Sequence, residues 1–146
     1  TCTYSGAISV KYNELQTKIL EKFGEIYGIC FQIKDDIFDY ISSEKKLGKP
    51  VGNDIREGKI TLPLLYALNV SQKKEEYLDI IRRKDFSKEN INKIINFTIS
   101  NGGIEYAKQK MEKYKQEALT ILKNIENEKI RKSLELVLQH TIEREN

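Results

Sequence analysis

Three aspartates and a glutamine recur at helical spacing in the first third of the chain. On a helical wheel of about 100° per residue, Gln32, Asp35, Asp36 and Asp39 share an arc of about 100°. Apolar residues flank this arc on both sides: Ile29, Ile33, Ile37 and Tyr40 on one, Phe31 and Phe38 on the other. Carboxylates without neighbouring His or Cys suit Mg²⁺, which also takes phosphate oxygens and water. The arc therefore predicts a magnesium site, and the alternative is a solvated acidic helix face.

Two glycines extend the same arc toward the N-terminus. Gly24 and Gly28 lie one and two turns before Gln32 on the wheel. Because glycine has no side chain, a ligand could approach the backbone of the helix at these positions. The pattern predicts a cavity along this face.

The loop that follows contains glycines and two lysines. Gly48-Lys49-Pro50 and Gly58-Lys59 present ammonium groups one loop away from the aspartates, either as solvated residues or as point charges for a diphosphate. A P-loop is excluded, because five residues separate Gly52 from Gly58 and Ile60 follows Lys59. An EF-hand is excluded, because no glycine stands sixth from Asp35 or Asp36.

Helical periodicity dominates the rest of the chain. Apolar residues recur every three or four positions, while Trp is absent and Pro occurs only twice, so an all-α fold is predicted. Glycines and capping residues divide the pattern into a bundle of about six helices. The expected helices cover residues 13–41, 61–70, 71–83, 87–99, 104–125 and 130–142, with a loop over 42–59.

Charge, cysteine content and hydropathy exclude several classes of protein. Lys and Arg total 25 against 22 Asp and Glu, and this small excess argues against nucleic-acid binding. The longest apolar stretch, Leu62 to Val70, is far shorter than the roughly 20 residues of a membrane span. Two cysteines without a CxxC pair favour a reducing compartment, and we expect a cytoplasmic protein.

Three segments together resemble the trans-type isoprenyl diphosphate synthases, or polyprenyl synthetases. The segments are Phe31-Gln32-Ile33-Lys34-Asp35-Asp36-Ile37-Phe38-Asp39, then Leu47-Gly48-Lys49-Pro50-Val51-Gly52-Asn53-Asp54-Ile55, then Gly58-Lys59-Ile60-Thr61-Leu62-Pro63. The resemblance implies the helical bundle of the isoprenoid synthases. It also implies Mg²⁺-dependent, head-to-tail condensation of an allylic diphosphate with isopentenyl diphosphate. The resemblance is greatest to the bacterial long-chain group, such as octaprenyl diphosphate synthase, and the farnesyl and geranylgeranyl synthases follow closely.

The resemblance also implies roles for individual residues. Asp35, Asp36 and Asp39 match the second aspartate-rich motif, which binds Mg²⁺. Lys49 and Lys59 match lysines that contact diphosphate, and Asp54 supports their loop by pairing with a base. Phe31 and Gln32 border the reacting centre, with Gln32 near the allylic cation. Arg144 falls where long-chain members keep an arginine near isopentenyl diphosphate.

The first aspartate-rich motif of the family has no counterpart, because Asp35-Asp36 is the only adjacent Asp pair. We therefore expect residues 1–146 to be the C-terminal half of a polyprenyl synthetase domain, inactive in isolation, from a homodimeric parent. Product length is not readable from this half. The alternatives are a non-catalytic partner subunit, a helical interaction module, or a relative of the terpene cyclases.

Overall fold

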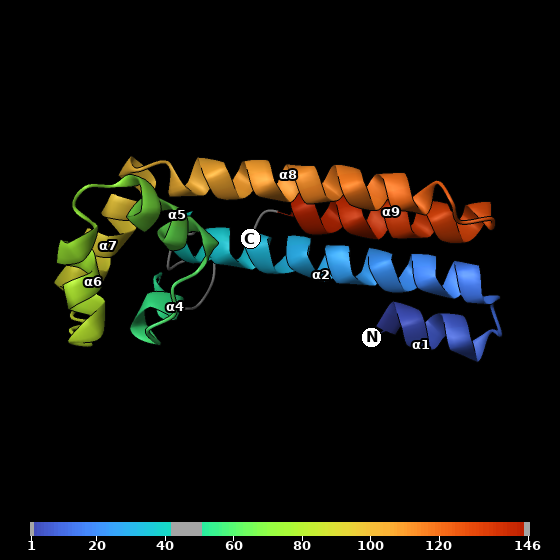
Figure 1. The fold of residues 1–146 in the computed structure, drawn as a ribbon, viewed down its shortest axis with the longest axis horizontal. Coiled ribbons are helices and arrows are strands. Elements are labelled where there is room, and N and C mark those ends of the chain that lie inside the picture. The colour runs from blue at the N-terminus through green and yellow to red at the C-terminus, as the bar shows by residue number, and fades with distance from the viewer. Residues whose placement is uncertain (1, 42–50, 145–146) are drawn as a thin grey trace. The chain divides into compact units, whose positions relative to one another are not determined.

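The computed structural model describes residues 2–41 and 51–144, and every regular element in these ranges is a helix (Figure 1). The all-α prediction is confirmed. The helices are α1 (Cys2–Ser9), α2 (Glu14–Ile41), α4 (Asn53–Arg56), α5 (Leu62–Val70), α6 (Lys74–Arg82), α7 (Lys88–Ser100), α8 (Gly103–Leu122) and α9 (Glu128–Glu143).

The chain divides into two compact units. One unit is Asp35–Gln109, and the other comprises the residues before Asp35 together with those from Lys110 onward. Both α2 and α8 contribute to each unit, since the division falls within these two helices. No helix in the described ranges is long and apolar enough to cross a membrane.

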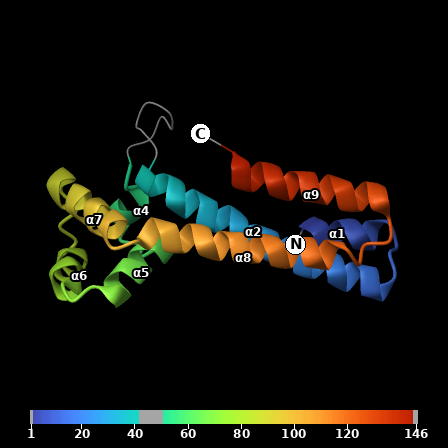
Figure 2. The same cartoon turned by 90° about the horizontal axis from the view of Figure 1, so that it is seen from above.

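The unit formed by the two ends of the chain packs α1, α9 and the part of α8 from Lys110 onward with the first part of α2. Helices α8 and α9 run antiparallel, as Figures 1 and 2 show. A buried amide fixes the turn between them, because Gln16 Nε2 donates to the Asn124 carbonyl at 3.0 Å and Gln16 Oε1 accepts from the Glu126 N–H at 3.3 Å. The core side chains include Phe23, Ile26, Cys30, Ala118, Leu122 and Leu138.

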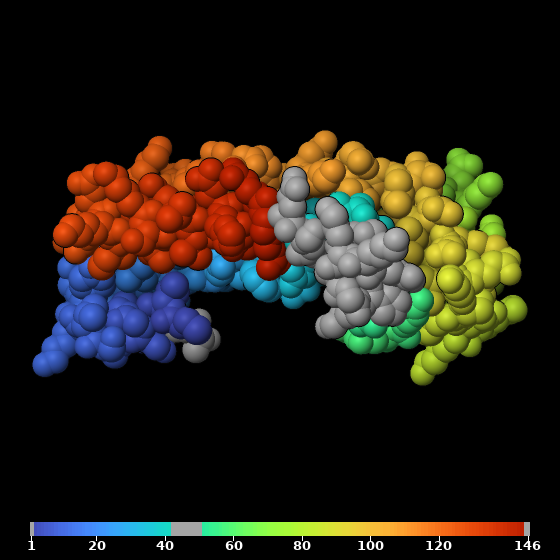
Figure 3. Space-filling view, turned by 180° about the vertical axis from the view of Figure 1, so that it is seen from behind, coloured from blue at the N-terminus to red at the C-terminus, as the bar shows by residue number. Residues whose placement is uncertain are grey.

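This unit also exposes apolar side chains on α1 and α9, the blue and red helices of the face in Figure 3. Ile8 on α1 is 54% exposed, and Leu136 on α9 is 67% exposed. These two side chains are therefore outside the core of the unit.

The unit formed by Asp35–Gln109 is built around α5. Pro63, Leu64, Ala67 and Leu68 are buried, because α6 and α7 pack against this helix. At Gly103, a Cβ would collide with the Pro63 carbonyl oxygen, so glycine allows the start of α8 to approach α5 closely. Stacked rings add to the packing, with Tyr77 on Phe97 at 3.7 Å and Tyr66 on Tyr106 at 4.1 Å between centroids.

Most helix positions agree with the sequence prediction, and three details differ. Helix α1 was not predicted, because its sequence has little amphipathic pattern. Helix α4 interrupts the expected loop. Helix α6 begins at Lys74 rather than after Ser71, whose Oγ accepts a hydrogen bond from the Lys73 N–H at 3.2 Å and so forms a turn before the helix.

Candidate active site

The predicted site residues divide between the two units. Asp35, Asp36 and Asp39 occupy the last turns of α2, a stretch without the Gly or Pro that would break the helix. Asp36 is only 6% exposed, whereas Asp35 and Asp39 are partly exposed. In the part of the chain that the structure describes, no three His, Cys, Asp or Glu side chains are grouped so as to hold a metal ion.

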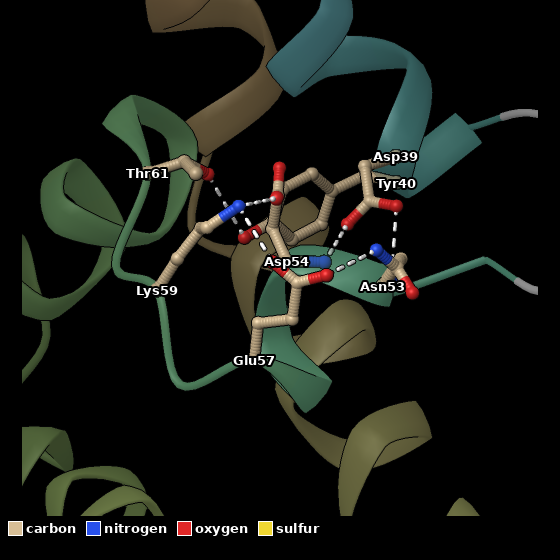
Figure 4. A network of polar contacts seen from close by, with 7 residues as sticks. All are labelled: Asp39, Tyr40, Asn53, Asp54, Glu57, Lys59 and Thr61. Carbon is tan, nitrogen blue, oxygen red and sulfur yellow. Dashed lines mark hydrogen bonds and ion pairs between the residues drawn. The ribbon is translucent and has the colours of Figure 1, made fainter.

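Asp39 binds the backbone at the start of α4. Its Oδ1 accepts from the Asn53 N–H at 2.9 Å and its Oδ2 from the Asp54 N–H at 3.0 Å, as Figure 4 shows. The Asp39 carbonyl also accepts from the Gly52 N–H at 2.9 Å. Burial raises the pKa of Asp39, although the hydrogen bonds from Asp54 and Asn53 oppose this shift. The structure thus gives this carboxylate a capping role that the sequence analysis did not predict.

Lys59 is held by two acids of the same loop. Its Nζ lies 2.6 Å from Glu57 Oε2 and 3.2 Å from Asp54 Oδ1 (Figure 4). Hydrogen bonds to Glu57 and then Asp54 raise the pKa of Lys59. Asn53 extends the network, because its Nδ2 donates to Glu57 Oε1 at 3.0 Å. Asp54 therefore does pair with a base in this structure, and that base is Lys59.

Two groups in this region were missed as polar contributors. Tyr40 was assigned to the apolar wall, but its hydroxyl lies 3.4 Å from Thr61 Oγ1 (Figure 4). Burial raises the pKa of Tyr40 to about 12. Glu57 forms an ion pair with Lys59, as Asp54 does. The sequence could have indicated this pair, since an acid two residues before a lysine is a possible partner.

The remaining site residues belong to the other unit. Phe31 on α2 is 39% exposed, and the Arg144 guanidinium carbon lies 4.5 Å from the centre of its ring. Gln32 is exposed on the same helix. The structure therefore brings together Phe31 and Arg144, to which the resemblance gave separate roles. Lys49 lies outside the described residues.

The predicted cavity along Gly24 and Gly28 is only partly present. Gly24 faces α1 rather than a cavity, because a Cβ there would collide with Thr3 Oγ1. Gly28 does face open space, since nothing lies within 4 Å of a Cβ built on it. A half-domain could leave core residues such as Ile33, Ile37 and Leu64 uncovered, yet these side chains are 6%, 2% and 0% exposed. The helices of this chain cover all three.

The donor set fits Mg²⁺ better than a metal that needs a complete protein cage. Asp35 and Asp36 carry carboxylate oxygens, the hard donors that Mg²⁺ prefers, while Asp39 already accepts two backbone hydrogen bonds. Mg²⁺ typically takes one or two carboxylates and completes its octahedron with phosphate oxygens and water. A pair of carboxylates is therefore sufficient for a magnesium ion that binds together with a diphosphate.

Comparison with known proteins identifies the family. The model of the polyprenyl synthetase family matches residues 1–98. The chain belongs to the polyprenyl synthetase family. It is 42% identical over 105 residues to a short chain isoprenyl diphosphate synthase of Methanocaldococcus jannaschii, covering 70% of this chain and 32% of that protein.

Solved structures give the same result. A geranylgeranyl pyrophosphate synthase from Bacteroides thetaiotaomicron superposes with a TM-score of 0.88 at 41% identity, covering 98% of this chain and 48% of that one. A polyprenyl synthase from Caulobacter crescentus, complexed with calcium and isoprenyl diphosphate, gives 0.86 at 27% identity, covering 98% and 44%. The chain thus spans less than half the length of these family members. The octaprenyl group is not confirmed, because two of them are short-chain and geranylgeranyl synthases.

Proposed function

We propose that this chain supplies the C-terminal half of a trans-type isoprenyl diphosphate synthase, which condenses an allylic diphosphate with isopentenyl diphosphate. The observation that carries the proposal is the arrangement on α2, where Asp35 and Asp36 precede Asp39, and Asp39 anchors the loop that contains Lys59. Membership of the polyprenyl synthetase family supports it. The short-chain and geranylgeranyl relatives favour a product of similar length over an octaprenyl one.

Asp35 and Asp36 are the proposed Mg²⁺ ligands, with Asp39 positioned to add a contact only through its remaining lone pairs. When bound, the metal neutralises the diphosphate and stabilises it as it leaves. Calcium in the Caulobacter synthase complex supports a divalent cation in the family.

Lys49 is proposed to contact the allylic diphosphate, and Lys59 to be a second lysine that contacts phosphate. In the structure Lys59 contacts Glu57 and Asp54, so a diphosphate would have to replace one or both carboxylates. This exchange is favourable only if the incoming group carries more negative charge at hydrogen-bonding distance. We therefore expect Lys59 to respond to diphosphate and not to a neutral prenyl alcohol.

Phe31 and Gln32 are proposed to border the allylic cation, and Arg144 to contact isopentenyl diphosphate. A carbocation survives only where water is excluded and oriented dipoles face it. The ring of Phe31 and the side-chain amide of Gln32 offer groups of this kind at adjacent positions of α2. Arg144, which stacks on Phe31, adds a permanent positive charge.

The remaining half of the synthase, with the first aspartate-rich motif, is proposed to come from residues outside 1–146. Family members two to three times as long as the matched region support this, since the chain covers 32% and 48% of the two described above. We expect the complete synthase to be a homodimer.

Calorimetry with farnesyl diphosphate tests the metal site. We expect binding that requires Mg²⁺, is abolished by EDTA, and weakens at least about tenfold in Asp35→Asn and Asp36→Asn, because a charged ligand is lost. Asp79→Asn, an exposed aspartate on α6, is the control and should bind as the wild type does. Equal binding with and without Mg²⁺ by all variants would instead indicate a helical interaction module with an incidental acidic face.

A further inference from the structure

Lys34 lies between Ile33 and Asp35 of the aspartate-rich segment, but its side chain contacts α9. Its Nζ donates a hydrogen bond of 2.6 Å to the carbonyl oxygen of Ile142, a residue 108 positions away in the sequence. Lys34 is partly buried and Ile142 is buried. The ammonium group of Lys34 is thus used for a contact within the unit that carries the chain ends.

The accepting carbonyl belongs to the last turn of α9. Carbonyls of a last turn have no partner within their own helix, and the C-terminal end of a helix attracts cations. An ammonium group at Ile142 therefore satisfies the backbone and the helix dipole together. It also fixes the point on α2 at which α9 ends.

Two further contacts follow the same line along α2. Tyr27 Oη and Thr141 Oγ1 lie 2.9 Å apart, and the Arg144 guanidinium lies over the Phe31 ring at 4.5 Å. Lys34 thus contacts the end of α9, as Tyr27 and Phe31 of the same helix do.

We propose that Lys34 is a positioning residue, which holds the end of α9 so that the guanidinium of Arg144 stays on Phe31. A cation–π contact on a partly exposed ring is weak compared with the entropy lost when a chain end is ordered. The charge-assisted hydrogen bond from Lys34 to Ile142 is the stronger contact, and it lies two residues before Arg144. Its consequence for substrate binding rests on the proposed function.

Nuclear magnetic resonance of the chain tests the positioning directly. The Phe31 ring should shift the Arg144 δ-methylene protons upfield, and Phe31→Leu should abolish that shift. Lys34→Met keeps the apolar stem but loses the donor, so we expect the upfield shift to disappear and the Arg144 amide, bonded to the His140 carbonyl, to exchange at least about tenfold faster. Lys34→Arg, which retains a donor, should restore both signals.

Lys18→Met is the matched control, because Lys18 is an exposed lysine of α2 paired only locally with Glu14. It should leave the Arg144 signals unchanged. An unchanged Arg144 shift and exchange rate in Lys34→Met would overturn the proposal. If Lys34→Met does not fold, the test is made on the wild type by measuring how fast lysine ammonium protons exchange with water. We expect those of Lys34 to exchange more slowly than those of Lys18, and equal rates would overturn the proposal.

Titration with isopentenyl diphosphate separates this inference from the proposed function. We expect the Arg144 guanidinium signal to move in the wild type and Lys34→Arg, and to require at least about fivefold more ligand in Lys34→Met, since the group is then no longer held in place. If wild type and Lys34→Met need the same ligand concentration, the role of Lys34 is contradicted but the proposed function is not. If farnesyl diphosphate does not bind in the presence of Mg²⁺ but the Arg144 signal still responds to isopentenyl diphosphate, the proposed function is contradicted but the role of Lys34 is not.

Discussion

At the scale of single residues, Asp39 illustrates how a motif residue can serve the fold as well as the chemistry. Both of its carboxylate oxygens accept backbone N–H groups of α4, so it connects the end of α2 to the loop that contains Lys59. A short helix of four residues has no other means of satisfying these donors within itself. The third aspartate of the segment therefore organises the loop on which the diphosphate-binding proposal depends.

Removing this carboxylate should destabilise the chain. We expect Asp39→Ala to lower the free energy of unfolding by about 1–2 kcal/mol, because two backbone donors lose their acceptor. Asp39→Asn keeps one acceptor oxygen and should cost less. Urea unfolding measures both, with Asp79→Ala on the surface of α6 as the control. A cost for Asp39→Ala no larger than that of the control would show that the capping contacts are unimportant.

The two cysteines should differ in reactivity. Cys30 is fully buried, and burial raises the pKa of its thiol from 9.0 to about 11, whereas Cys2 is exposed. We expect a thiol reagent at pH 8 to modify one cysteine in the folded chain and both after unfolding. Two thiols that react equally fast in the folded chain would contradict the burial of Cys30.

The same shift gives a pH dependence of stability. The folded state keeps the Cys30 proton to higher pH than the unfolded state does. The contribution of Cys30 to the free energy of unfolding is therefore complete below about pH 9 and is lost between about pH 9 and pH 11. Cys30→Ala should lose stability from its smaller side chain but should show a weaker decline over this range. Parallel declines in the two proteins would assign the effect to other groups.

At the scale of elements, the start of α4 depends on one glycine. Gly52 has φ of +78°, a region that L-residues with side chains rarely adopt, and a Cβ there would lie 2.6 Å from Ile91 Cγ2 on α7. Its N–H also donates to the Asp39 carbonyl. A backbone turn and a close approach of two elements thus coincide at this position.

Gly52→Ala should lower the free energy of unfolding by about 1–3 kcal/mol, because it combines an unfavourable φ with a steric clash. Gly6→Ala in α1 is the control, since a Cβ there has no neighbour within 4 Å and alanine favours a helix by about 0.5–1 kcal/mol. Thermal unfolding of both variants measures the difference. A stable Gly52→Ala chain would show that α4 can move away from α7 at little cost.

At the scale of the whole molecule, we expect the chain alone to make no prenyl product. Incubated with farnesyl diphosphate, labelled isopentenyl diphosphate and Mg²⁺, it should show no elongation above background, because the proposed reaction needs a second aspartate-rich motif and Asp35-Asp36 is the only adjacent Asp pair. A full-length family member under the same conditions is the positive control. Robust elongation by residues 1–146 would contradict the assignment of a half-domain.

Much of the fold could be predicted from local pattern. The apolar spacing of residues 13–41 predicted α2 to within one residue, and Ser87 predicted the start of α7, where its Oγ accepts from the Asn90 N–H. Helix α1 could not be predicted in this way, because its eight residues have little amphipathic pattern, and it lies so close to α2 that a Cβ on Gly24 would collide with Thr3. Packing, and not propensity, decides such an element.

The sequence by itself determined the family, the all-α class and the order of the motif residues, because these follow from residue types and spacing along one helix and its loop. Only the tertiary structure decided the partners: Asp39 with α4, Lys59 with Glu57 and Asp54, Lys34 with Ile142, and Arg144 with Phe31. These contacts join residues brought together by turns and by helix packing. A helical wheel records only the directions of side chains on one helix, so it cannot give the groups that other elements bring to them.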